Sequence, residues 1–226
     1  MKTNLLKKHA KSFYWASFFL SNDVFKKCSY LYNFCRTLDD IVDNDNKLEI
    51  KKEIFFKFKK DFLNKNLNNQ IINDMWSIIN SENISKKIVI DLFDGVETDL
   101  EEKVKINSKK DLLIYSYRVA GTVGLMMSKI LKVNNRESLR GAIDLGIAMQ
   151  LTNVARDVCE DNKRNRKYIQ SDFSSIKETI YEAEIFYQKS FKSISSISIS
   201  SRFSVIVARR IYKKIGDYIL KQKNIQ

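Results

Sequence analysis

The chain has 226 residues, of which 44% are hydrophobic, and a net charge of +13 from 40 basic and 27 acidic side chains. This length and apolar content allow one domain whose core needs no disulfides or structural metals. Three cysteines without zinc-type spacing and an N-terminus without the apolar stretch of a signal peptide predict a reduced, cytoplasmic chain. No apolar run approaches the ~20 residues that cross a bilayer, so we expect at most peripheral contact with the inner face of the membrane.

Helix-breaking residues are scarce. There is no proline, where average usage of ~5% would give roughly eleven, and there are six glycines. Apolar residues recur three and four positions apart, which predicts an all-α bundle forming a single domain over residues 1–226. In chain order, we expect helices at about 4–20, 23–44, 48–64, 70–80, 85–105, 109–131, 136–162, 174–191 and 200–223. The serine-rich stretch 189–201 fits either a poor helix or a loop.

The helix expected at 23–44 ends with two aspartates, Asp39 and Asp43, four residues apart. A helix places them on the same side, where like charges cost a few tenths of a kcal/mol. On one side of this helix, apolar and aromatic residues lead down to Arg36 and the two acids. A single pair of this kind is usually a solvated helix face, so the pair gains meaning only from a second one.

The helix expected at 109–131 contains Gly121 and Gly124, in the stretch YSYRVAGTVGLM. A glycine inside a helix costs up to ~1 kcal/mol relative to alanine. Two explanations stay open at this point: close packing of a neighbouring helix, or thinning of the helix where a ligand passes the backbone.

The helix expected at 136–162 carries the second acidic pair, Asp157 and Asp161. One stripe of this helix changes from apolar to polar and acidic along its length, and a neighbouring stripe is apolar throughout. The mixed stripe contains Leu139, Ile143, Gly146, Gln150, Asn153, Asp157 and Asp161, and the apolar stripe contains Ile147, Leu151, Val154 and Val158. The acids therefore lie beside the core and not opposite it.

Together the two pairs predict one site. Carboxylates without histidine or cysteine at ligand spacing suit hard cations, and Mg²⁺ binds one or two carboxylates together with substrate phosphates. Both helices would wall a cavity that is apolar at one end and metal-binding at the other, a shape suited to an amphiphile with an anionic head. The excess positive charge fits a solvated surface or a polyanionic partner. Because acidic clusters suit nucleic acid poorly, we expect a diphosphate and no nucleic acid.

With these residues, the chain strongly resembles the squalene/phytoene synthase family of head-to-head isoprenyl synthases. The matching stretches are KKHAKSF, CRTLDDIVDN, YSYRVAGTVGLM, DLGIAMQLTNVARDVCEDNKRNRKYI and ARRIYKKIGDYIL, in family order over most of the chain. The sequences of these stretches resemble those of bacterial phytoene synthases more than those of eukaryotic squalene synthases. The resemblance implies an isoprenoid-synthase-type helical bundle around a central cavity.

The resemblance also implies roles for individual residues. The residues of the first Mg²⁺-diphosphate motif would be Asp39 and Asp43, and the residues of the second would be Asn153, Asp157 and Asp161. Arg36, Arg156, Ser12 and His9 match positions that contact diphosphate or brace the acids. Cavity and mouth positions are matched by Tyr32, Tyr115, Gln150, Tyr168 and Tyr212, and Phe13, Gly121 and Gly124 are grouped with them as substrate-binding. Tyr32 and Arg36 are grouped with the four aspartates as catalytic.

The implied reaction joins two geranylgeranyl diphosphates to phytoene, for carotenoid biosynthesis, through a cyclopropylmethyl diphosphate. Mg²⁺, with Mn²⁺ as an alternative ion, would assist the loss of diphosphate. NADPH is not expected for this reaction. The alternatives are a squalene or dehydrosqualene synthase acting on two farnesyl diphosphates, and a non-enzymatic assembly factor on the same fold, whose mitochondrial examples tend to lack the aspartates. The protein would be a monomer or weak dimer.

Three departures from the family pattern bear on the cavity. The chain is short between Tyr168 and Arg209, which affects a late part of the cavity wall. Ala10 replaces a serine common in some relatives, and Gln170 stands where a proline commonly follows the Tyr168 segment. All four aspartates are retained.

Overall fold

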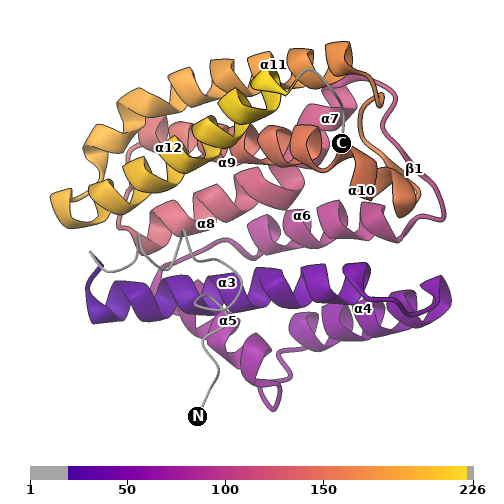
Figure 1. Ribbon diagram of the computed structural model, residues 1–226. Helices are drawn as coiled ribbons and strands as arrows, with labels where there is room; N and C mark the ends of the chain where they lie inside the picture. Colours follow the sequence, from indigo (N-terminus) through magenta and orange to yellow (C-terminus); the bar gives the residue numbers. More distant parts are fainter. Residues whose placement is uncertain (1–19, 223–226) are drawn as a thin grey trace.

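A computed structural model describes residues 20–222, and these form two stacked layers of helices (Figure 1). The helices are α3 (Asn22–Asp43), α4 (Leu48–Leu63), α5 (Gln70–Ser81), α6 (Lys86–Glu97), α7 (Lys109–Ser116), α8 (Thr122–Ile130), α9 (Arg136–Arg156), α10 (Val158–Lys163), α11 (Phe173–Phe191) and α12 (Ile199–Lys221). The all-α prediction is confirmed. The predicted helix at about 4–20 lies outside the described residues.

An aromatic core holds the first layer together. Phe34 of α3 packs against Phe58 and Phe62 of α4 and against Phe93 of α6, with ring centroids 5.5–5.7 Å apart. Trp76 of α5 stacks on Phe62 at 5.2 Å and donates its indole N–H to the Phe62 carbonyl oxygen at 3.0 Å. Such pairs add about 0.5–1.5 kcal/mol each beyond the burial of their area. This core fixes α3, and with it the first acidic pair.

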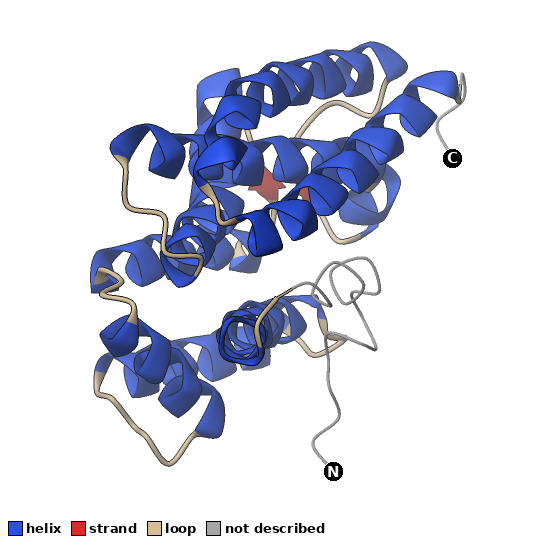
Figure 2. Ribbon diagram, turned by 90° about the vertical axis from the view of Figure 1, so that its left-hand side faces the viewer, coloured by secondary structure: helices blue, strands red, loops and turns tan. Residues whose placement is uncertain are grey.

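The second layer is built around α9, which packs against α8, α11 and α12. Its N-cap is Asn135, whose side chain accepts the Ser138 N–H at 2.8 Å. The predicted apolar stripe is buried, with Ile147, Leu151 and Val154 each less than 9% exposed. The sequence pattern therefore identified the packing face of this helix correctly. Figure 2 shows the two layers end on, with the small strand region inside the α9 layer.

The predicted helix at 85–105 is wrong in its last third. Helix α6 ends at Glu97, a 3₁₀ turn η1 (Thr98–Leu100) follows, and β1 (Val104–Lys105) then pairs in parallel with β2 (Arg166–Lys167). Two acidic residues, Glu101 and Glu102, stand where the helix would have its negative end, which disfavours continuing it. The Val104 N–H donates to the Asn165 carbonyl at 3.1 Å, so β1 holds the segment after α10 in place.

Two other expected helices are interrupted, and the undecided stretch at 189–201 is now defined. The one at 136–162 breaks at Asp157, which has φ −100° and ψ 11° and separates α9 from α10. The one at 109–131 contains a π-helical turn, η2 (Tyr117–Gly121). Between 189 and 201, helix α11 runs to Phe191, a 3₁₀ turn η3 (Lys192–Ser196) follows, and α12 begins at Ile199. The stretch that could be a poor helix or a loop therefore contains a short 3₁₀ turn and a break.

The glycines of η2 and α8 allow close approach of α9. A Cβ added to Gly124 would lie 2.2 Å from the Ala142 carbonyl oxygen, and one on Gly146 would lie 2.3 Å from that of Ala120. Real Cβ atoms do not approach a carbonyl oxygen so closely, so both positions require glycine for backbone packing. The packing explanation therefore holds for Gly124, which also lines the cavity described below.

Gly124→Ala is expected to destabilise the fold by about 1–3 kcal/mol, because the methyl group would force α8 away from α9. For a chain of this size, that loss lowers the melting temperature by roughly 2–12 °C. Thermal unfolding followed by circular dichroism measures it. Gly216→Ala is the matched control, because its added Cβ would lie 3.4 Å from an Ile180 side chain, an ordinary contact. Equal melting temperatures for Gly124→Ala and the wild type would contradict the packing explanation.

Within residues 20–222, no helix has the length and apolar character needed to cross a bilayer. Cys28, Cys35 and Cys159 are not joined in disulfides.

Candidate functional site

The two acidic pairs lie at the same end of the bundle. Helices α3 and α9 run in the same direction in Figure 1, so the last turns of α3 and the α9–α10 junction meet at the right-hand end of the view. Asp39 and Asp43 lie on the last two turns of α3, while Asp157 is the junction residue and Asp161 lies on α10. The structure thus brings together the two motifs that the sequence separates by more than a hundred residues.

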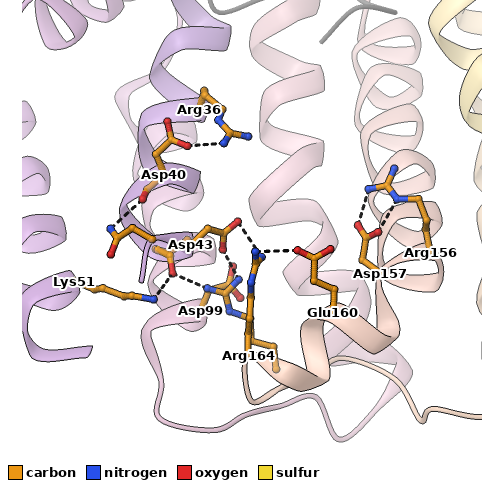
Figure 3. A network of polar contacts seen from close by, with 12 residues as sticks. Arg36, Asp40, Asp43, Lys51, Asp99, Arg156, Asp157, Glu160 and Arg164 are labelled. Atoms are coloured by element: carbon orange, nitrogen blue, oxygen red, sulfur yellow. Dashed lines mark hydrogen bonds and ion pairs between the residues drawn. The ribbon is translucent and has the colours of Figure 1, made fainter. Parts of the chain in front are cut away.

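Two arginines after α10 connect the motifs. Arg166 donates to Asp43 at 2.7 Å and to the Val42 carbonyl oxygen at 3.0 Å, and its side chain is 8% exposed. Arg164 lies 3.3 Å from the other Asp43 oxygen and 2.9 Å from Glu160 of α10. Figure 3 shows Arg164 between Asp43 and Glu160, linking the end of α3 to α10. The break at Asp157 and the β1–β2 pair bring these arginines to Asp43. A continuous helix over 136–162 would not do so.

A fifth carboxylate, Asp99, lies between the two pairs. It comes from η1, and it accepts hydrogen bonds from Tyr168 at 2.5 Å and from Tyr115 at 3.0 Å. The two tyrosine rings stack with centroids 4.8 Å apart. Burial raises the pKa values of both tyrosines, so both remain protonated donors near neutral pH. Asp99 interacts electrostatically with Asp39, Asp43, Asp161 and Arg166.

Crowding of acids raises their pKa values. Desolvation, followed by the charge of Asp43, raises the pKa of Asp39 to about 7, although the residue is exposed at the surface. Desolvation and Asp157 raise the pKa of Asp161 to about 7. Desolvation raises the pKa of Asp99 to about 6, against the opposing charge of Arg166. Ionised carboxylates are therefore disfavoured here unless a cation joins them.

This crowding predicts a pH-dependent stability. A carboxyl whose folded-state pKa is raised above the ordinary ~3.9 contributes stability below that ordinary value and loses it as the pH rises through the folded-state pKa. We therefore expect the melting temperature of the metal-free protein to fall by about 5 °C between pH 5 and pH 8, or ~2 kcal/mol, after allowing for solvent screening at Asp39.

Calorimetry in EDTA measures this slope. The double variant Asp39→Asn/Asp161→Asn is the comparison, since it removes the two groups with the highest pKa and should flatten the slope. A slope that is unchanged in the double variant would mean that other groups cause it.

The two predicted diphosphate arginines pair with different aspartates. Arg36 pairs with Asp40 at 2.6 Å and not with Asp39 or Asp43, and its Nε is buried without a hydrogen-bond partner. Arg156 grips Asp157 with two hydrogen bonds of 2.6 Å. In Figure 3 the Arg156–Asp157 pair stands apart from the Arg164 network. Arg36 therefore does not brace the first acidic pair directly, whereas Arg156 does contact an acid of the second pair.

An apolar cavity leads away from the acids. It has a volume of about 360 Å³ and runs between α3, α8, α9, η3 and α12. Tyr32, Gln150, Asn153 and Tyr212 line it, as the resemblance implied, and Gly124 does too. The Asn153 Oδ1 atom is buried without a hydrogen-bond partner, one helical turn before Asp157. The predicted apolar cavity that ends near the acids is therefore present.

The donor set fits Mg²⁺ that is shared with phosphate. Within the described part of the chain, no three acidic, histidine or cysteine side chains converge to hold an ion by themselves. Mg²⁺ commonly takes one or two carboxylates and completes its shell with phosphate oxygens and water. The unpaired Asn153 Oδ1 and the raised pKa values of Asp39 and Asp161 are what such a cation would relieve. The metal assignment of Asp39, Asp43, Asn153, Asp157 and Asp161 stays a prediction.

Sequence reasoning missed some residues of the site. Asp99, Arg164 and Arg166 were not predicted, although both arginines belong to the matched stretch that ends at Ile169. Tyr115 and Tyr168 meet at Asp99, at the acidic end, and are not among the residues that line the cavity. Gly121 is buried at the end of η2. The predicted residues His9, Ser12 and Phe13 lie outside the described residues.

The fold and the site together define the all-helical isoprenoid synthase class. A dehydrosqualene synthase solved with a ligand superposes with a TM-score of 0.80 at 27% identity, covering 93% of this chain and 81% of that one. The squalene synthase HpnC from Alicyclobacillus acidocaldarius superposes with a TM-score of 0.80 at 16% identity, covering 97% and 91%, and supports the fold. The model of the squalene/phytoene synthase family matches residues 6–173, and the chain belongs to that family.

Curated relatives of the chain include several phytoene synthases. The chain is 29% identical to phytoene synthase 2, chloroplastic, of Solanum lycopersicum, an alignment covering 94% of this chain and 78% of that protein. It is 25% identical to 15-cis-phytoene synthase of Pantoea ananas, covering 92% and 77%. It spans a smaller share, 61%, of the chloroplastic phytoene synthase of Daucus carota, at 29% identity. These identities indicate a prenyltransferase-type enzyme.

Proposed function

We propose that the protein is a Mg²⁺-dependent phytoene synthase that joins two geranylgeranyl diphosphates head to head. The observation that carries the proposal is one end of the bundle where two aspartate pairs meet beside the mouth of an apolar cavity. Acids and arginines together suit a metal-bound diphosphate head, and the cavity suits its hydrocarbon tail. The phytoene synthase relatives favour the C20 substrate.

The residues of the site have separate tasks in this reaction. Bound Mg²⁺ would be held by Asp39 and Asp43 on one helix and by Asn153, Asp157 and Asp161 on the other, and it would supply charge stabilisation to the departing diphosphate. Arg156 and Arg36 lie beside the acids and offer guanidinium N–H groups to phosphate oxygens. Arg166 keeps Asp43 in place from a buried position.

The apolar cavity has the second task. Loss of diphosphate from the first substrate leaves an allylic cation, which the double bond of the second substrate attacks. Loss of a proton from the resulting cation closes the ring of a cyclopropylmethyl diphosphate. A second ionisation, rearrangement and loss of a proton then give phytoene. Side chains such as Val123, Leu145 and Met149 keep water from these cations. The face of Tyr32, on the cavity wall, can stabilise positive charge.

Two other functions compete with this one. The likeness to a dehydrosqualene synthase at 27% identity favours a synthase of the same mechanism acting on two farnesyl diphosphates. Retention of both aspartate pairs disfavours a non-enzymatic assembly factor, since such a protein has no use for crowded acids that cost stability.

Product analysis separates these functions. The purified protein is incubated with Mg²⁺ and either the C15 or the C20 diphosphate, with and without NADPH, and hydrocarbon products are identified by mass spectrometry. We expect phytoene from the C20 substrate without NADPH. Squalene or dehydrosqualene as the main product would support the C15 alternative. The absence of any condensed product from either substrate would contradict both synthase proposals.

A further inference from the structure

A second cavity lies beside the α9–α10 junction. It has a volume of about 730 Å³ and is lined by the end of α9, by α10, by the first turn of α11 and by the second half of α12. It shares no lining residue with the apolar cavity of the proposed active site. Volumes of about 300–1,000 Å³ are typical of sites for small molecules. This second cavity, which we call the side cavity, is therefore large enough for a ligand of its own.

The floor of the side cavity is apolar. Val158 and Ile176 line it, are 5% and 4% exposed, and belong to one small core cluster. Three isoleucines of α12 also line it, namely Ile211, Ile215 and Ile219. The apolar body of a ligand would therefore lose contact with water on this floor, which favours its binding.

The charged groups that line the side cavity are all cationic. Arg210 and Lys214 are four residues apart on α12 and therefore share one face, and Arg156 lines the cavity from the end of α9. Lys214 lies 3.6 Å from Asp217, whereas the Arg210 side chain has no ion-pair partner within residues 20–222. None of the described residues that line the cavity is acidic. Grouped cations repel one another, and an anion between them relieves that repulsion.

We propose that the side cavity binds an amphiphile with an oxyanion head, either a carboxylate or a phosphate. The guanidinium groups of Arg156 and Arg210 offer paired N–H donors, a geometry that suits both head groups. An amphiphile fits better than a bare anion, because exposed cations alone hold a hydrated anion weakly and the apolar floor supplies further affinity.

Arg156 connects the side cavity to the second acidic pair. It donates to both carboxylate oxygens of Asp157 at 2.6 Å, as the two dashed lines of Figure 3 show. The effect of a ligand on the acidic site rests on the proposed function, in which Arg156 also offers N–H groups to diphosphate. A head group that binds Arg156 would compete with diphosphate for it. The ligand should therefore weaken binding of diphosphate, and diphosphate should weaken binding of the ligand by the same factor.

Titration calorimetry in EDTA, with octyl phosphate and with octanoate, tests the side cavity. We expect one or both to bind, and the tighter of the two identifies the head group. Inorganic phosphate and octan-1-ol, which supply only the head or only the tail, should bind at least about tenfold more weakly. Arg210→Gln/Lys214→Gln should weaken binding of the amphiphile by at least about tenfold. Arg136→Gln/Arg140→Gln, at the other end of α9, removes the same charge and should bind like the wild type.

Three results would overturn the site: no binding of either amphiphile, equal losses for the two double variants, or binding that Arg210→Gln/Lys214→Gln leaves unchanged. The last result would place the amphiphile in the apolar cavity instead. Asp39→Asn should bind the amphiphile like the wild type. Because this measurement needs neither Mg²⁺ nor diphosphate, failure of the side cavity and failure of the proposed function are separate results.

Titration with pyrophosphate in Mg²⁺ tests the coupling. The amphiphile should weaken binding of pyrophosphate by about fivefold in the wild type, and should have no effect at the same concentration in Arg210→Gln/Lys214→Gln. No effect in the wild type would contradict the coupling through Arg156. An equal effect in both proteins would also contradict it, because it would show direct competition at the acids.

Discussion

Replacing Asp39 by asparagine is expected to lower turnover about a thousandfold while making the metal-free protein more stable above neutral pH. A metal ion contributes several kcal/mol of charge stabilisation to the transition state, and ~4 kcal/mol corresponds to a thousandfold in rate. Stability should rise because ionised Asp39 is desolvated and repelled by Asp43, which is why its pKa is raised to about 7. The amide keeps the shape of the side chain and removes its charge.

Two measurements check this prediction. Turnover is measured with saturating substrate and Mg²⁺, and the melting temperature is measured in EDTA at pH 8, where we expect an increase of a few degrees. The matched control is Asp40→Asn on the next residue, which is exposed as Asp39 is but pairs with Arg36. It should lose less than about tenfold in rate, since an exposed pair contributes about 0–1 kcal/mol. Similar turnover for Asp39→Asn and the wild type would show that Asp39 holds no metal ion.

Replacing Arg166 by methionine is expected to destabilise the protein by about 3 kcal/mol, the largest loss of stability among the changes considered. Removing one partner of a buried ion pair costs about 3–5 kcal/mol, because it leaves a charge without compensation. We expect the lower end of this range because the Asp43 side chain is 36% exposed and still has Arg164 at 3.3 Å as an ion-pair partner. The lost charge would also raise the pKa of Asp99, which Arg166 now lowers.

Chemical unfolding at pH 7 measures this loss of free energy. Thermal unfolding should show a matching fall in melting temperature of roughly 6–12 °C. Arg164→Met is the control, because its side chain is 39% exposed and its ion pairs should contribute at most about 1 kcal/mol. Arg166→Lys should recover only part of the stability, since an ammonium group cannot span both Asp43 and the Val42 carbonyl as the guanidinium does. If the Arg164 and Arg166 variants were equally stable, the connection of the two motifs through Arg166 would be wrong.

Helical periodicity was sufficient to predict much of this fold. The apolar stripe of Ile147, Leu151 and Val154 is buried as expected, because one face of a 3.6-residue repeat has only the core to pack against. Helix α6 was predicted too long, because the sequence pattern past Glu97 stays periodic while the pairing of Val104 with Arg166 is a long-range contact. Contacts of that kind leave no local signal in a sequence.

The acidic half of the site was predictable and its supporting half was not. Asp39 with Asp43, and Asp157 with Asp161, share the spacing of helical neighbours, and that spacing is a local signal. Asp99 stands among charged residues on a 3₁₀ turn and resembles a surface acid, until Tyr115 and Tyr168 are brought to it from other elements. Arg166 is one of several basic residues after α10, and only the β1–β2 pair shows that it is the buried one.

The central claim is that both aspartate pairs serve one Mg²⁺-dependent diphosphate site. Calorimetric titration with inorganic pyrophosphate tests it most directly, because this probe contains the head of the substrate without its tail. We predict binding to the wild type in Mg²⁺ and none in EDTA, with a loss of at least about tenfold in Asp39→Asn and also in Asp157→Asn. Binding that persists in EDTA, or that either variant leaves unchanged, would contradict a site shared by the two motifs.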